Sequence, residues 1–137
     1  MISVEEVRQE ILTAFKTIHD ANSSYLVNYP NLKIVDIERQ RDPFVEVELD
    51  FTGITHAAIG EKEILIPGFF NVYFNYRNGT GTSASTLYTD ILNQHLSLEQ
   101  FGDIQFGENK PMSVEFIPGW QGVMNNIRFD ITSNPSC

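Results

Sequence analysis

The sequence is poor in cysteine and in basic residues, with one cysteine and nine lysines and arginines among 137 residues. Because Cys137 is alone, no disulfide can form within the chain. The nine basic residues face 18 acidic ones, which gives a net charge of −9. Proteins that follow a nucleic-acid backbone or an anionic membrane surface need clustered positive charge. We therefore expect neither partner to bind this chain directly.

Long apolar runs are also missing. No stretch approaches the roughly twenty apolar residues of a membrane span, so we expect no membrane segment. The first residues lack the basic and apolar regions of a signal peptide, which favours synthesis and folding in a cytoplasm. The length predicts one domain over 1–137. Because chain termini are usually poorly ordered, we expect a flexible tail at about 133–137 that includes an incidental Cys137.

The clearest pattern is a strand, a glycine turn and a helix between Gly68 and Leu96. Period-two alternation over 69–76 predicts the strand, and spacings of three and four over 83–96 predict the helix. The strand carries aromatic residues on both faces, so it is either central or presents its second face to a partner chain. One face has Phe70, Val72, Phe74 and Tyr76, and the other has Phe69, Asn71, Tyr73 and Asn75.

The rest of the chain supplies one more helix and several strands. An amphipathic pattern predicts a first helix from about Val4 to Asp20, and FVEVELDF over 44–51 has the alternation of an antiparallel strand with one wet face. Weaker strands are expected at Leu32 to Ile37, 54–59, 64–66 and 104–106, with a loop over 107–111 and later strands at 112–117 and 123–131. This order predicts an α+β fold: a mostly antiparallel sheet with two helices packed on one face.

Catalytic signatures are weak. Gly79 to Ala84 has the G-x-G-x-x-A form of a dinucleotide-binding turn, but that motif functions inside a parallel βαβ unit. The glycines are better explained by a sharp corner. The histidines, His19, His56 and His95, lack metal-ligand spacing, and we expect each to be a partly exposed surface residue. We predict no enzymatic activity and no catalytic, metal-binding or cofactor-binding residues.

Two features remain as candidates for a binding role. Glu46, Glu48 and Asp50 form a carboxylate row on one strand face. The row either is a solvated outer face or has a role, in which case it binds a cation or lines an anionic surface. Trp120 lies in a turn-rich setting between Pro118-Gly119 and Gln121-Gly122. It either plugs the end of the core or anchors a partner.

The order of elements and the residues at the corner resemble the tail-terminator proteins of long-tailed bacteriophages, including a related phage domain of formerly unknown function. The resemblance covers about Val4 to Ile131. It rests on the first helix, the strand beginning Pro43-Phe44-Val45, the block from Gly68 through Gly79-Thr80-Gly81 to Ala84, Asp90 and Leu96, and a final strand pair around Trp120.

The resemblance implies a structural role in the virion. Such proteins assemble in the host cytoplasm as a ring, usually hexameric, on the head-proximal end of the tail tube, where they stop tube growth and meet the head-tail connector protein. The partners would be further copies of this chain, the tail-tube protein and the connector, with DNA passing through unbound. On this view Phe69, Tyr73 and Trp120 are candidate subunit contacts, and Glu46, Glu48 and Asp50 are candidate channel-lining or rim residues.

Two alternatives remain open at this point. One is a head-side connector or another minor tail protein of similar size. The other, from a different class, is a small anion- or nucleotide-binding α+β domain that uses the 79–84 turn.

Overall fold

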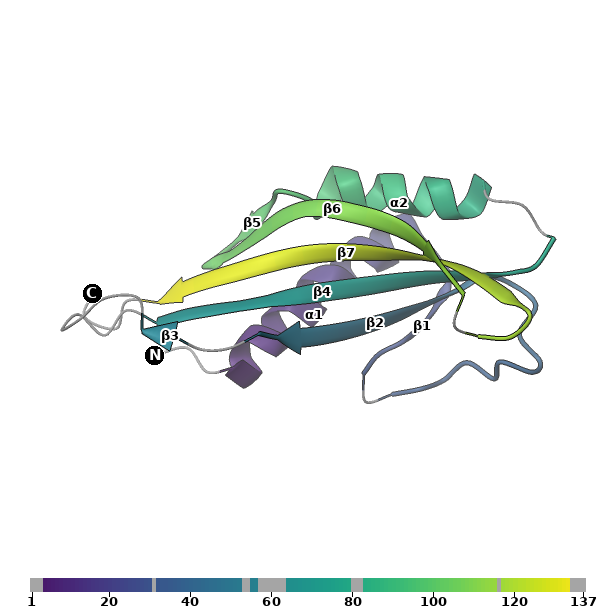
Figure 1. Cartoon of the computed structure of the whole chain (residues 1–137), viewed down its shortest axis with the longest axis horizontal. Helices are drawn as coiled ribbons and strands as arrows, with labels where there is room; N and C mark the ends of the chain where they lie inside the picture. The colour runs from purple at the N-terminus through teal and green to yellow at the C-terminus, as the bar shows by residue number, and fades with distance from the viewer. Residues whose placement is uncertain are drawn as a thin grey trace.

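The chain forms one curled sheet with two helices beside it (Figure 1). The computed structural model describes residues 4–30, 32–52, 55–56, 64–79, 83–115 and 117–133. The elements are α1 (Val4–Asn22), β1 (Leu26–Asn28), β2 (Phe44–Phe51), β3 (Thr55–His56), β4 (Ile64–Arg77), α2 (Ser83–His95), β5 (Gln100–Phe101), β6 (Ile104–Val114) and β7 (Trp120–Ser133).

The strands follow the spatial order β1-β2-β4-β7-β6-β5, and β3 pairs with β4. Every pairing is antiparallel except that of β1 with β2. The expected α+β class and mostly antiparallel sheet are therefore confirmed, as are the helices at 4–20 and 83–96 to within two residues. Most of the expected strand at 54–59 and most of the expected tail at 133–137 lie outside the described residues.

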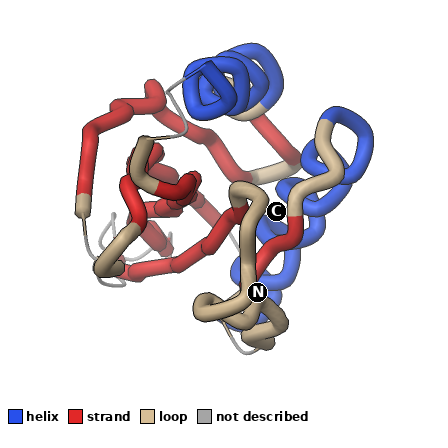
Figure 2. Tube along the Cα trace, turned by 90° about the vertical axis from the view of Figure 1, so that its right-hand side faces the viewer, coloured by secondary structure: helices blue, strands red, loops and turns tan. Residues whose placement is uncertain are grey.

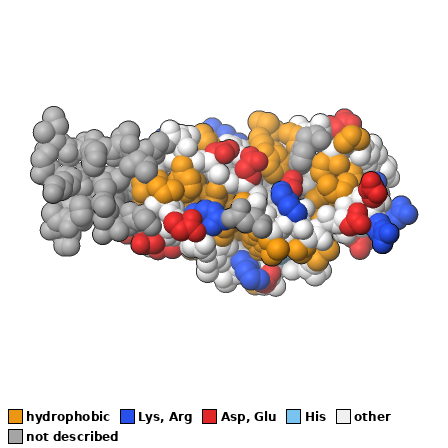
Figure 3. Space-filling model, turned by 90° about the horizontal axis from the view of Figure 1, so that it is seen from below, with side chains coloured by type: hydrophobic (Ala, Val, Ile, Leu, Met, Phe, Trp, Pro, Cys, Tyr) orange, Lys and Arg blue, Asp and Glu red, His pale blue; other side chains and the backbone are white. Residues whose placement is uncertain are grey.

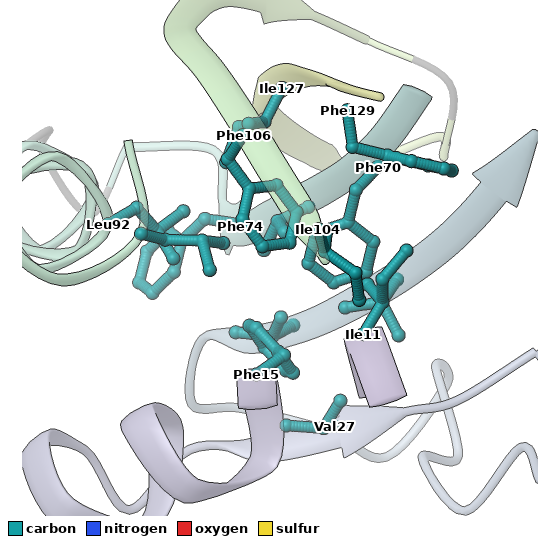
Figure 4. Close-up of a cluster of buried hydrophobic side chains, with 14 of the residues drawn as sticks. Ile11, Phe15, Val27, Phe70, Phe74, Leu92, Ile104, Phe106, Ile127 and Phe129 are labelled. Atoms are coloured by element: carbon teal, nitrogen blue, oxygen red, sulfur yellow. The ribbon is translucent and has the colours of Figure 1, made fainter. Parts of the chain in front are cut away.

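Both helices pack on the same face of the sheet (Figure 2). Phe15 of α1 meets Phe70 of β4 at 5.5 Å between ring centroids, and Tyr88 of α2 stacks on Phe74 at 5.1 Å. Figure 4 shows Phe15, Phe70 and Phe74 converging with side chains of β6 and β7. The core therefore lies between the helices and the Phe70 face of β4, which leaves the other sheet face without a helix in the described part of the chain.

The predicted strand at Leu32 to Ile37 is wrong. The strand on this side is instead β1, and residues 33–43 form an irregular loop. Asn28 causes the change, because its side-chain oxygen accepts hydrogen bonds from the backbone N–H groups of Ile34 and Val35 at 2.8 and 3.0 Å. Those amides are thus satisfied by a side chain in place of a neighbouring strand.

The predicted loop at 107–111 is also wrong, because these residues continue strand β6. The register of β6 on β7 shifts between Phe106 and Asn109, which marks a β-bulge. Pro111 lies beyond the bulge and pairs with Asn125. Proline is tolerated at such a position when its nitrogen points to the open side of an edge strand. Gly107 and Pro111, which suggested a loop in the sequence, therefore mark a β-bulge and an edge strand.

Gly68 lies where three strands are in close contact. A Cβ at this position would come within 2.5 Å of both the Asp50 carbonyl oxygen and Cζ of Phe129. The Asp50 oxygen belongs to the backbone of the paired strand and cannot move cheaply. Glycine is therefore required at position 68, because only a residue without Cβ lets the β4 backbone lie this close to the Asp50 carbonyl and the Phe129 ring.

We predict that Gly68→Ala lowers the free energy of unfolding by about 1–3 kcal/mol through overpacking. Urea denaturation measures the loss. Gly107→Ala is the matched control, because a Cβ there would meet Arg128 atoms only at 3.5 Å and beyond. Equal stability of the two variants would contradict the close approach at Gly68.

Candidate interaction surface

The sheet face that no helix covers carries both sets of residues singled out from the sequence. In the pairing of β2 with β4, Glu46 lies opposite Tyr73 and Asp50 lies opposite Phe69. Directly paired residues project from the same face of a sheet. The carboxylate row and the second aromatic face of β4 therefore form a single surface. We call this surface, made of Glu46, Glu48, Asp50, Phe69, Asn71 and Tyr73, the acidic-aromatic face.

Hydrogen bonds fix the middle of this face. The Tyr73 hydroxyl donates to Oε1 of Glu48 at 3.2 Å, and Nδ2 of Asn71 approaches the same oxygen at 3.4 Å. Asn126 of β7 donates from Nδ2 to Oδ1 of Asn71 at 2.6 Å. Burial and, after it, the nearby Glu48 carboxylate raise the pKa of Tyr73 to about 12. Tyr73 therefore stays neutral and a hydrogen-bond donor at physiological pH.

The three carboxylates of the row have different surroundings. Glu46 forms an ion pair with Lys33 at 2.6 Å, and its side chain is only 18% exposed. Glu48 and Asp50 are exposed. The negative charge that this face offers to a partner is therefore concentrated at Glu48 and Asp50, beside the half-buried rings of Phe69 and Tyr73.

Trp120 is buried at one end of the sheet, where it pairs with Arg77, the last residue of β4. It is 1% exposed, and its ring meets Phe44 edge-on at 4.9 Å between centroids. The guanidinium carbon of Arg77 lies 4.4 Å from the centre of the Trp120 ring, a cation–π contact. Of its two possible roles, the structure supports the plug. The alternative role as a subunit contact is not favoured, because only 1% of Trp120 is exposed.

Arg77 also fastens the loop that follows β1. Its guanidinium donates from Nη2 to the carbonyl oxygens of Ile37 and Gln40 at 3.0 and 2.9 Å. A planar guanidinium group that hydrogen-bonds to two carbonyl groups and stacks on an aromatic ring holds these partners in one geometry. Arg77 thus connects Trp120, the end of β4 and the 33–43 loop.

The fastened loop presents apolar side chains outward. Leu32, Ile34 and Ile37 are 60%, 52% and 38% exposed. Figure 3, which views the molecule from below Figure 1, shows apolar side chains beside basic and acidic ones in its right half. We call residues 32–41 the apolar loop. The chain therefore carries two distinct exposed surfaces, the acidic-aromatic face and the apolar loop.

Sequence reasoning missed Arg77, although a signal was present. Arg77 continues the every-second-residue series that starts at Phe69 and Tyr73, so it belongs to the second face of the strand. The contacts from Arg77 to Ile37 and Gln40 cross almost forty residues of sequence. No local pattern could have revealed them.

His19 is buried, and the expectation of a partly exposed surface residue is wrong for it. It is 3% exposed, with Nδ1 2.8 Å from the Tyr88 hydroxyl and Nε2 2.8 Å from the Tyr25 carbonyl oxygen. Because a carbonyl can only accept, Nε2 carries the proton and donates, and Nδ1 accepts from Tyr88. His19 therefore connects α1 to α2 and has a structural role.

The described residues offer little for chemistry. No three His, Cys, Asp or Glu side chains among them gather to hold a metal ion. Gly79 has φ +83°, as a corner glycine should, while residues 80–82 of the G-x-G-x-x-A stretch lie outside the described residues. In the described part of the chain, neither helix is long and apolar enough to cross a membrane.

Comparisons with known proteins support the fold. No family model matches the sequence, and no curated protein matches it. A solved structure, of a protein designated only by a sequence number that states no function, is similar with a TM-score of 0.73 and 14% sequence identity. The likeness covers 98% of this chain and 99% of that chain. At this identity the likeness shows the fold alone.

We predict that Arg77→Lys lowers the free energy of unfolding by about 1–3 kcal/mol, because the ammonium cannot reproduce the fork on two carbonyls. It should also release the apolar loop, so trypsin should cleave after Arg39 and Arg41 faster than in the unchanged chain. Arg128→Lys is the control, since that side chain is 64% exposed. Unchanged stability and cleavage in Arg77→Lys would show that the fork does not hold the loop.

The raised pKa of Tyr73 predicts that the free energy of unfolding falls at high pH. An unfolded chain has a tyrosine pKa of about 10, whereas that of Tyr73 is raised to about 12. Between these values the unfolded chain has lost a proton that the folded chain keeps, so stability falls as the pH rises. Tyr73→Phe should therefore show a shallower fall in unfolding free energy between about pH 10 and pH 12.

Urea titrations at several pH values across this window measure the slopes. Tyr88, whose pKa is also raised by burial, is present in both proteins, so the difference isolates Tyr73. Identical slopes would rule out a contribution from Tyr73.

Proposed function

We propose that this chain is a structural protein that assembles with copies of itself into a ring at the head-proximal end of a bacteriophage tail tube. The observation that carries the proposal is the presence of two exposed and chemically different surfaces on one small domain: the acidic-aromatic face and the apolar loop. A chain with two unlike contact surfaces can join head to tail, and such contacts form a ring when the rotation from one copy to the next closes. The resemblance to tail-terminator proteins supplies the hexameric number and the position on the tail.

The sheet supports an assembly role. A single antiparallel sheet with helices on one side normally shows a polar second face to water. Here that face has Phe69, Tyr73 and Met124 partly exposed among polar residues. Aromatic residues and methionine are enriched in protein interfaces. Phe69 and Tyr73 therefore remain the proposed subunit contacts, without Trp120.

The charge of the chain suits a channel for DNA. A ring of chains with a net charge of −9 repels the phosphate backbone, so the genome can pass without adhering. The ring would stop addition of the tail-tube protein and present its other side to the head-tail connector. A head-side connector or another minor tail protein would need the same self-contacts. Binding to the end of the tail tube is therefore what distinguishes a tail terminator from these alternatives.

The wild-type chain is expected to form a multimer larger than a dimer as its concentration rises, measured by light scattering after size exclusion. Added to polymerising tail-tube protein, it should shorten the tubes and appear at one end in electron micrographs. A chain that remains monomeric and leaves tube length unchanged would overturn the proposal. Multimers that leave tube length unchanged would favour the connector alternative.

Phe69→Ser should weaken this self-association by at least about tenfold while the fold is retained, because the phenyl side chain of Phe69 lies on the proposed contact surface. Leu87→Ser is the matched control, since Leu87 is 64% exposed on α2, in the opposite layer. Concentration-dependent light scattering compares the two. Equal weakening by both variants, or by neither, would remove Phe69 from the contact.

A further inference from the structure

We propose that, within the proposed ring, the apolar loop of one copy binds the acidic-aromatic face of the next copy. This inference rests on the proposed function and adds to it the pair of surfaces that meet. It also assigns Glu48 and Asp50 to the subunit contact and not to the channel lining. The charge, the exposure and the fixed position of the loop all favour this contact.

Charge distribution favours the loop as the approach point of an acidic partner. The apolar loop, residues 32–41, contains three basic residues, Lys33, Arg39 and Arg41, and two acidic ones, Asp36 and Glu38. The loop therefore has a net charge of +1, whereas the remainder of the chain, with six basic and 16 acidic residues, has a net charge of −10. Two copies repel each other over most of their surfaces, but not where this loop meets an acidic patch.

Two of the three basic side chains of the loop, those of Arg39 and Arg41, are available to a partner. Arg39 has a 90% exposed side chain and only a long contact of 3.8 Å with Asp36. Arg41 is exposed as well. In the described part of the chain, neither arginine forms an ion pair with Glu48 or Asp50. Within one copy, only Lys33 of the loop pairs with a carboxylate of the face, that of Glu46. Arg39 and Arg41 on the loop, and Glu48 and Asp50 on the face, remain available to a second copy.

Both surfaces pair charge with apolar area. The loop has Leu32, Ile34 and Ile37 exposed beside its arginines. The face has Phe69 and Tyr73 beside its carboxylates. Interfaces of this kind gain affinity from burial of the apolar groups, while the charges set orientation and exclude wrong pairings.

The loop is held in place before any partner arrives. Arg77 binds its carbonyls, Asn28 binds its amides at Ile34 and Val35, and Lys33 at its start pairs with Glu46. A surface that is already ordered loses less conformational entropy on binding. On the face, the hydrogen bonds of Tyr73 and Asn71 hold Glu48 in the same way.

The test reverses charge on each surface separately. Arg39→Glu with Arg41→Glu should weaken self-association at least about tenfold, and so should Glu48→Arg with Asp50→Arg, because each places like charges opposite one another. Mixing the two variants should restore multimers, since each reversed surface then meets its reversed partner and each native surface a native one. Light scattering after size exclusion measures the multimer mass of each double variant and of their mixture.

Matched controls separate a specific contact from a general change in charge. Arg8→Glu with Lys16→Glu on α1, and Glu99→Arg with Asp103→Arg near β5, change the net charge equally at other places and should associate as the wild type does. The milder Glu48→Gln with Asp50→Asn covers the case in which the double reversal unfolds the chain; it should weaken association without changing the unfolding transition.

The outcomes distinguish this inference from the proposed function. Multimers that form in either reversed variant as in the wild type, or fail to return on mixing, would overturn the loop-to-face contact while leaving the ring proposal standing. A wild-type chain that never self-associates would overturn both. Loss in each reversed variant with recovery on mixing would support the contact.

Discussion

The antiparallel pairing of β4 with β7 is the constraint on which the rest of the structure depends. Fourteen residues of β4 pair in continuous register with β7, from Ile64 opposite Ser133 to Arg77 opposite Trp120. This register places Phe70, Val72 and Phe74 toward the helices and Phe69, Asn71 and Tyr73 away from them. A shift by one residue would exchange the two sets, so the core and the acidic-aromatic face are determined together.

The same pairing brings Arg77 to Trp120, and through Arg77 it determines where the apolar loop lies. The loop has no strand neighbours over most of its length, so its shape depends on the side chains of Asn28 and Arg77. The two surfaces that we assign to subunit contact are therefore both consequences of one strand: one is its outward face, and the other is held by its last residue.

Much of the fold could be predicted from the sequence, because its main elements have strong periodicity. The helices, the FVEVELDF strand and the 69–76 strand follow from spacing alone, and the one-sided placement of the helices follows from the order of the elements. The irregular loop and the β-bulge did not follow, because they depend on Asn28, Arg77 and the partner strand. For the site, alternation placed Phe69 and Tyr73 on a second face, but only the β2–β4 register showed that Glu48 and Asp50 share it. The burial of Trp120 needed the position of Phe44, 76 residues earlier in the sequence.

Pro111 has a consequence for how large an assembly of this chain can become. The N–H of Asn109 points away from β7 and donates to the Ser97 hydroxyl, so the nitrogen of Pro111, two residues on, also points away from β7 and has no hydrogen to offer. A strand from another molecule would find the edge of β6 already bonded to residues 97–99 near the bulge, and beyond them this gap in the hydrogen-bond ladder. The sheet is thereby protected against continuing from molecule to molecule into a fibre. In the ring that we propose, copies would therefore join through side chains, whose geometry can close on itself after a fixed number of subunits.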